Sequence, residues 1–142
     1  PPHPPGAMDF PVLPTMERIA RDRWQEAYLW RSLAEAGAPV AFASDWPVTD
    51  VSVMRGIQAA MTRHPYDGCR DERLGLLETL HAYTAGGAWA AHRDHVTGRL
   101  VPGLAGDLVL IDGDIETLPP DEIGQTGIAL TICGGHITHE AL

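Results

Sequence analysis

The chain has 142 residues and a formal net charge of −9 at pH 7, and arginine supplies all of its strong positive charge because lysine is absent. This balance argues against a nucleic-acid partner, which needs a basic surface, and no run of about 18 apolar residues is present to span a membrane. Cys69 and Cys133 lie far apart in the sequence, which favours two reduced thiols in a cytoplasmic protein over a disulfide.

The first part of the chain is predicted to contain a proline-rich loop and then a helix. Residues 1–14 hold half of the twelve prolines, a composition typical of irregular structure. Apolar residues recur at helical spacing over 24–36, and Asp22 and Gln25 come close to a capping box at the start of this pattern. Gly37 is expected to end the helix.

The next segment predicts a buried strand followed by a second helix. Residues 39–44 form a short apolar run that ends at Asp45, and Pro47 prevents a paired central strand from continuing. A helix capped by Asp50 or Ser52 is expected to follow. The order helix, strand, loop and helix corresponds to about one and a half units of an α/β barrel.

The remainder of the chain changes from a helical pattern to a strand pattern near Gly98. Leucine spacing predicts a helix over 74–83, and Gly86–Gly87 is expected to separate it from a shorter helix that runs to His92. Short runs of Val, Ile and Leu then predict strands over 99–102 and 107–111, and a hairpin of 128–133 with 137–138 across Gly134–Gly135.

Asp45 is the first candidate for a functional side chain. Ligands of parallel α/β folds bind at the C-terminal ends of the strands, where this carboxylate is expected to lie. A carboxylate at that position can bind a divalent metal and take a proton from the water molecule that the metal activates. A turn-forming aspartate is the alternative interpretation of the same residue.

Several motifs of the chain resemble those of the metal-dependent amidohydrolases and occur in the same order. The resemblance is strongest to the amidohydrolase-3 group, which includes N-acyl-D-amino-acid deacylases and N-substituted formamide deformylases. The segment 43–47, Ala-Ser-Asp-Trp-Pro, is similar to the G-S-D-x-P motif at the end of the last barrel strand of that family. The segment 98–109 is similar to the closing signature G-x-L-x-P-G-x-x-A-D-L-V, with Gly106 where alanine is usual. The segments 56–63 and 80–88, and the N-terminal Pro-Pro-His-Pro of 1–4, also resemble family segments.

The resemblance implies an α/β fold in which residues 1–97 form the last units of a (β/α)8 TIM barrel and residues 98–142 form strands of a small β-sandwich. The chain would then begin after barrel strand seven, because the H-x-H pair, the bridging Lys or acid and the two further His of the family find no counterpart in it. We therefore expect this chain alone to be inactive and to bind a catalytic metal poorly, since catalytic zinc sites use three protein ligands.

The incomplete barrel leads to a further expectation about partners. Trp24, Trp30, Leu33 and Phe42 would have too little around them to cover their apolar surfaces. We expect either the remainder of the amidohydrolase chain or a self-association of this chain to cover them.

The resemblance also implies roles for individual residues. Asp45 would bind a divalent metal, with zinc expected and one or two ions in the full protein, and would act as general base and then general acid while a metal-bound hydroxide attacks the substrate. His3 would donate a hydrogen bond to a substrate carbonyl or carboxylate, and Trp46 and Pro47 would line the pocket. The alternatives are a surface His3 and a Trp46 that packs on the barrel rim.

The sequence thus predicts part of a metal-dependent hydrolase that acts on C–N bonds of small, non-peptide, amide-type substrates. A non-catalytic scaffold or a partner-binding remnant of the same fold is the alternative. Ester hydrolysis and ring deamination also occur in the superfamily, and the residues of this chain do not discriminate between these reactions.

Overall fold

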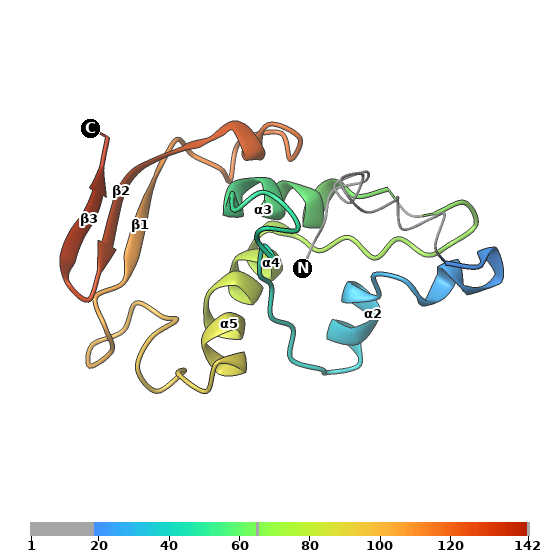
Figure 1. Ribbon diagram of the computed structural model, residues 1–142, viewed down its shortest axis with the longest axis horizontal. Helices are drawn as coiled ribbons and strands as arrows, with labels where there is room; N and C mark the ends of the chain where they lie inside the picture. The colour runs from blue at the N-terminus through green and yellow to red at the C-terminus, as the bar shows by residue number, and fades with distance from the viewer. Residues whose placement is uncertain (1–18, 65, 142) are drawn as a thin grey trace.

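The computed structural model describes residues 19–64 and 66–141, and His3 and the proline-rich segment 1–14 lie outside them. Helices occupy the first part of the described chain, and an antiparallel sheet of three strands lies at the opposite end of the molecule (Figure 1). In chain order the elements are the 3-10 helix η1 (Arg21–Glu26), α2 (Trp30–Glu35), α3 (Val53–Thr62), α4 (Leu76–Tyr83), α5 (Ala85–Ala90), β1 (Leu108–Asp112), the 3-10 helix η2 (Ile123–Gln125), β2 (Gly127–Cys133) and β3 (His136–Glu140).

The helix predicted over 24–36 is interrupted between η1 and α2, so the prediction is wrong for residues 27–29. Ala27 is extended, and Tyr28 adopts a left-handed conformation with φ of 56° between η1 and α2. The break allows the Tyr28 ring to meet the edge of Trp30, with ring centroids 5.7 Å apart, which favours aromatic packing over a continuous helix. Gly37 follows α2 with φ of 80°, in agreement with the predicted glycine stop.

Helix α3 begins where the sequence predicts. The Ser52 hydroxyl oxygen accepts a hydrogen bond from the Arg55 backbone N–H at 3.4 Å and so caps the first turn. The apolar face of α3 buries Met54, Ile57, Ala59 and Ala60.

The boundary between α4 and α5 lies at Thr84 and not at Gly86–Gly87, which are inside α5. Glycine is needed inside α5 because the segment before Asp45 lies close against this helix. A Cβ atom on Gly86 would lie 2.3 Å from the carbonyl oxygen of Val40, so the missing side chain is what lets the two backbones meet. Glycine here serves helix packing and does not end a helix.

The predicted strand over 39–44 pairs with no other strand in the part of the chain that the structure describes. Its backbone is held to a helix, because the Phe42 N–H donates to the carbonyl oxygen of Ala82 at the end of α4, at 3.0 Å. Burial still alternates, with Phe42 buried between the exposed Ala41 and Ala43. The period of two is therefore present, but a strand also needs a neighbouring strand to accept its hydrogen bonds.

Two apolar clusters hold the helices together. One contains Trp30 and Phe42, and the other contains Ile57 of α3 with Ile115 and Ile123. The expectation that Trp30 and Phe42 lack cover is thus wrong, since only 8% and 7% of their surfaces are exposed, whereas 49% of Leu33 is exposed.

Tyr83 packs against both clusters. Burial raises the pKa of its phenol to about 12, so the side chain stays neutral at physiological pH. It therefore contacts both clusters as an uncharged aromatic ring.

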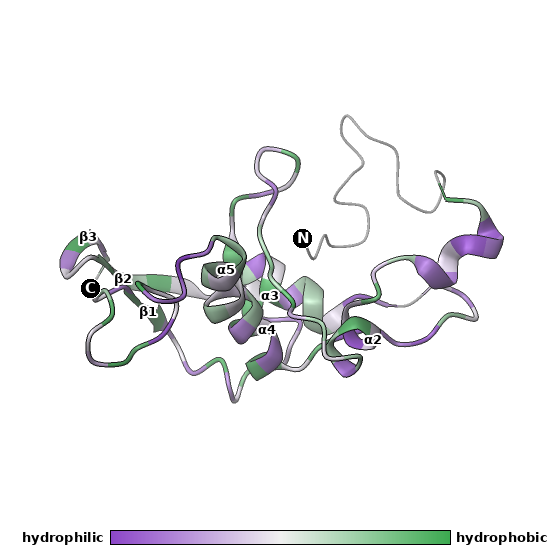
Figure 2. Ribbon diagram, turned by 90° about the horizontal axis from the view of Figure 1, so that it is seen from below, coloured by the Kyte–Doolittle hydropathy of each residue, from purple (hydrophilic) through white to green (hydrophobic). Residues whose placement is uncertain are grey.

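The sheet has the strand order β1–β2–β3, and the hairpin predicted across Gly134–Gly135 is confirmed as β2 and β3. Residues 99–102, which were expected to be extended, are irregular and belong to no strand. Figure 2 shows the sheet at one end of the elongated molecule with apolar residues along its strands. Four of these residues are between 36% and 60% exposed: Leu108, Val109, Leu110 and Ile137.

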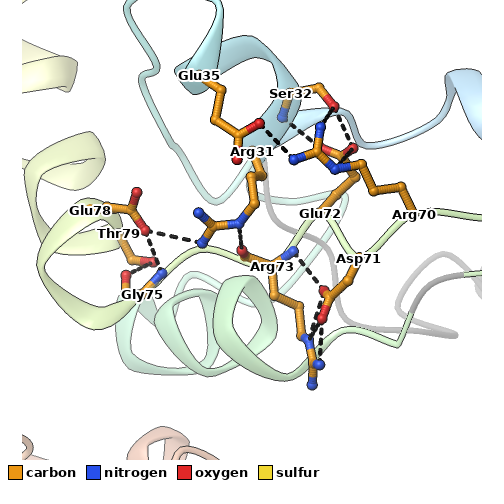
Figure 3. Close-up of polar contacts among 10 residues, drawn as sticks. All are labelled: Arg31, Ser32, Glu35, Arg70, Asp71, Glu72, Arg73, Gly75, Glu78 and Thr79. Carbon is orange, nitrogen blue, oxygen red and sulfur yellow. Dashed lines mark hydrogen bonds and ion pairs between the residues drawn. The ribbon is translucent and has the colours of Figure 1, made fainter.

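A polar network attaches the loop before α4 to α2 (Figure 3). The Glu72 carboxylate accepts hydrogen bonds from the Ser32 backbone N–H at 2.7 Å and from the Ser32 hydroxyl at 2.5 Å. The Arg70 guanidinium lies 2.6 Å from a carboxylate oxygen of Glu35, and the Arg31 guanidinium donates to the carbonyl oxygen of Arg73 at 2.8 Å. Since Glu72 is only 11% exposed, its hydrogen bonds are better shielded from solvent than the surface ion pairs around it.

Asp107 connects the loop after α5 to the β2–β3 turn. Its carboxylate accepts from the Thr97 hydroxyl and from the Gly134 backbone N–H, each at 2.6 Å. These two hydrogen bonds, the first more than the second, hold the pKa of Asp107 below its ordinary value of 3.8.

We therefore expect the Asp107 contact to be intact above pH 3.8 and to be lost as the pH falls through the lower pKa of the folded state. The Gly134 amide proton, followed by NMR, should titrate with a midpoint below 3.8. Asp107→Asn should remove that titration. A midpoint at or above 3.8 in the unsubstituted protein would contradict the contact.

None of the helices in residues 19–64 and 66–141 has the length and apolar character needed to cross a membrane.

Candidate functional site

Asp45 lies in the loop between the extended segment 39–44 and α3, and its side chain is exposed. Its backbone has φ of 59°, in the left-handed region that aspartate tolerates better than most residues. The next peptide bond, Trp46–Pro47, is cis. Non-glycine residues in this region occur both in turns and at functional sites, so the conformation fits either interpretation of Asp45.

Short-range hydrogen bonds hold the loop around Asp45. The Asp45 carbonyl oxygen accepts from the Val48 N–H at 2.8 Å, and the Ser44 hydroxyl oxygen accepts from the Trp46 N–H at 3.3 Å. The Thr49 hydroxyl donates to the carbonyl oxygen of Ser44. These contacts bracket Asp45 on both sides.

The far end of the loop is attached to the first turn of α3 through Asp50. One carboxylate oxygen of Asp50 accepts from the Ser52 N–H at 3.0 Å, and the other lies 2.8 Å from the Arg55 guanidinium. Of these contacts, the sequence indicated only the capping role of Asp50 or Ser52. Thr49 and Arg55 were missed, because the hydrogen bonds that they make depend on the closed conformation of the loop.

Trp46 and Pro47 follow Asp45 directly in the loop. Both are exposed, with 68% of the Trp46 surface accessible. Val48 and Val51 of the same loop are also exposed, at 39% and 63%. The loop therefore presents the Asp45 carboxylate among apolar side chains, whereas its second carboxylate, Asp50, is paired with Arg55. His3 lies outside the described residues, so its relation to this loop remains a prediction.

Asp45 can supply one oxygen ligand to a divalent metal, but the described residues do not complete such a site. Over residues 19–64 and 66–141 no group of three or more His, Cys, Asp and Glu side chains could hold a metal ion. A catalytic zinc site uses three protein ligands and an open position. The donor chemistry of Asp45 fits a single ligand, and the others would have to come from elsewhere.

Comparisons with known proteins give a consistent result. Residues 5–139 match the sequence profile described as the Amidohydrolase family. YtcJ of Bacillus subtilis, which is named as an amidohydrolase, is 29% identical over 140 residues, covering 94% of this chain and 26% of YtcJ. An imidazolonepropionase of Bdellovibrio bacteriovorus is 30% identical over 108 residues, covering 75% of this chain and 23% of the relative.

A solved structure is similar as well. A metal-dependent hydrolase from Pyrococcus furiosus superposes with a TM-score of 0.55 at 25% identity, covering 70% of this chain and 20% of that chain. The chain thus spans about a quarter or less of the length of each of these relatives.

Proposed function

Because the chain belongs to the amidohydrolase family, we propose that it is the C-terminal part of a metal-dependent hydrolase that cleaves C–N bonds of small, non-peptide, amide-type substrates. The observation that carries the proposal is Asp45, an exposed carboxylate held in a left-handed backbone conformation within the matched segment. The function would belong to the longer protein, because Asp45 is the one metal ligand that we assign to this loop.

Asp45 would act in two steps of the hydrolysis. A divalent cation, with zinc as the expected ion, would lower the pKa of a water molecule when bound by Asp45 and ligands from outside the described residues. Asp45 would accept a proton from the attacking water and then deliver it to the leaving nitrogen, so that the amide bond is replaced by a carboxyl group and an amine. Trp46 and Pro47 would border the substrate, and His3 would hydrogen-bond to it.

The same proposal accounts for the extended segment 39–44. In a (β/α)8 barrel it would be a strand, with neighbouring strands in place of the single hydrogen bond from Phe42 to Ala82. Residues 1–97 would complete the barrel, and residues 98–142 would contribute strands to a β-sandwich. The exposed residues of β1 and β3 are consistent with a further sheet layer over them.

A second substrate class follows from the relatives. Imidazolonepropionases are named for a compound with an imidazolone ring, and such a ring contains a cyclic amide. Three such relatives are 30% to 36% identical to this chain. Cyclic amides therefore belong in the same assay as N-acyl amino acids, and the non-catalytic alternative predicts that neither is hydrolysed.

Removal of the metal tests the proposal. The protein encoded by the full reading frame should hydrolyse at least one N-acyl or cyclic amide, lose this activity on dialysis against a chelator, and regain it when zinc is added, because the ion is required for attack by water. The 142-residue chain should show no activity under the same conditions. Activity that survives full metal removal, or an inactive full-length protein with bound metal, would contradict the proposal.

A further inference from the structure

We propose that Thr49 is a positioning residue for Asp45, which acts through the backbone and does not touch the substrate. The inference rests on the proposed function, because it concerns the geometry of the carboxylate that the function needs. Nothing in the sequence motif distinguishes Thr49 from any other turn residue.

The contacts of Thr49 define what it can do. Its hydroxyl donates to the carbonyl oxygen of Ser44, the residue directly before Asp45, across five positions of the chain. Its distance to the other carbonyl oxygen in reach, that of Asp50, is 3.5 Å, too long for a strong hydrogen bond. The hydroxyl thus fixes the peptide unit that leads into Asp45.

A second hydrogen bond controls the peptide unit on the other side. The Asp45 carbonyl oxygen accepts from the Val48 N–H at 2.8 Å. With the carbonyl groups of Ser44 and Asp45 both held, the two peptide planes that set φ and ψ of Asp45 have fixed partners. Even for aspartate, a φ of 59° is less favourable than the ordinary negative region, so the contacts around Asp45 stabilise this conformation.

The direction of the Asp45 carboxylate depends on this backbone conformation. If φ relaxed to the ordinary negative region, the Cα–Cβ bond would point in a different direction and the carboxylate would move with it. Groups that orient a metal ligand typically contribute about 10- to 100-fold to metal affinity or activity. Thr49 is the side chain of the described loop that holds the peptide before Asp45, so we assign this contribution to it.

The test compares three threonine variants in the full-length protein. Thr49→Val removes the hydroxyl and keeps the volume, and Thr49→Ser keeps the hydroxyl. Thr62→Val is the matched control, because the Thr62 hydroxyl also donates to a backbone carbonyl oxygen, that of Gln58 at 2.8 Å, but at the opposite end of α3. Zinc affinity is measured by competition with a chromophoric chelator, alongside kcat, KM and the thermal midpoint.

We expect Thr49→Val to weaken zinc binding by about 10- to 100-fold and to lower kcat at saturating zinc with little change in KM. Thr49→Ser should restore both, and Thr62→Val should lower the thermal midpoint about as much as Thr49→Val without changing zinc affinity. Equal zinc affinities for Thr49→Val and Thr62→Val would overturn the role of Thr49. If Asp45→Ala also leaves zinc affinity unchanged, the proposed function itself fails, which separates the two results.

Discussion

Replacing Asp45 by asparagine is expected to lower kcat of the full-length protein by about 10²- to 10⁴-fold, the usual contribution of a positioned proton acceptor and donor. Asparagine keeps the size of the side chain and the tolerance of a left-handed backbone, so the loop should retain its shape. Asp45→Ala should in addition reduce the amount of metal that copurifies, because it removes the ligand oxygen altogether.

The control for the Asp45 variants is Asp67→Asn, which makes the same chemical change in an exposed turn before α4. Its kcat and metal content should remain close to those of the unsubstituted protein. Metal content is measured by elemental mass spectrometry and kcat with the best substrate of the assay. If Asp45→Asn and Asp67→Asn behave alike, Asp45 is a turn residue and not a functional one.

The pair Gly86→Ala and Gly87→Ala should show opposite effects on stability. A Cβ atom on Gly86 would lie 2.3 Å from the Val40 carbonyl oxygen, and this backbone atom cannot move without displacing the segment that leads to Asp45. We expect Gly86→Ala to lower the free energy of unfolding by about 1–3 kcal/mol, as overpacking usually does.

The neighbouring position provides the contrast within the same helix. The closest atom to a Cβ on Gly87 is the Ala82 carbonyl oxygen at 3.9 Å, an ordinary contact distance. Gly87→Ala should therefore raise the free energy of unfolding by about 0.5–1 kcal/mol, because alanine loses less conformational entropy than glycine in a helix. Denaturation in guanidinium chloride measures both, and a destabilised Gly87→Ala together with an unaffected Gly86→Ala would contradict the packing described here.

Local features of the fold could be predicted where neighbouring residues alone decide the structure. The Ser52 cap of α3 and the Gly134–Gly135 hairpin depend on residues within a few positions of one another, and both are confirmed. The break at Tyr28 and the continuous α5 at Gly86 depend on contacts with distant residues. Such contacts are not encoded in periodicity, so the sequence pattern predicted a continuous helix in the first case and a broken one in the second.

The candidate site shows the same division. Asp45 stands out in the sequence because it ends an apolar run before Trp46–Pro47, and the structure places it in a loop directly after that run. The supporting Thr49 could not be found, since its hydrogen bond to Ser44 arises only when the loop closes. For residues 39–44 the sequence predicted a buried strand, but in this segment the structure buries Phe42 alone and pairs it with no described strand, because burial and pairing both require neighbouring strands.

Tyr83 has a consequence for the order in which parts of the molecule open. Its ring packs against the cluster around Trp30 and Phe42 and also against the cluster around Ile57 and Ile123. The Tyr83 ring therefore packs in both clusters at once, and a loss of packing in either cluster exposes part of the other. Fluctuations that reach the end of α4 should be global events rather than local ones. The hydrogen bond from the Phe42 N–H to the Ala82 carbonyl oxygen should therefore stay closed while the outer strands exchange their amide protons with solvent. The residues that lead to Asp45 are thus attached to the part of the chain that opens last.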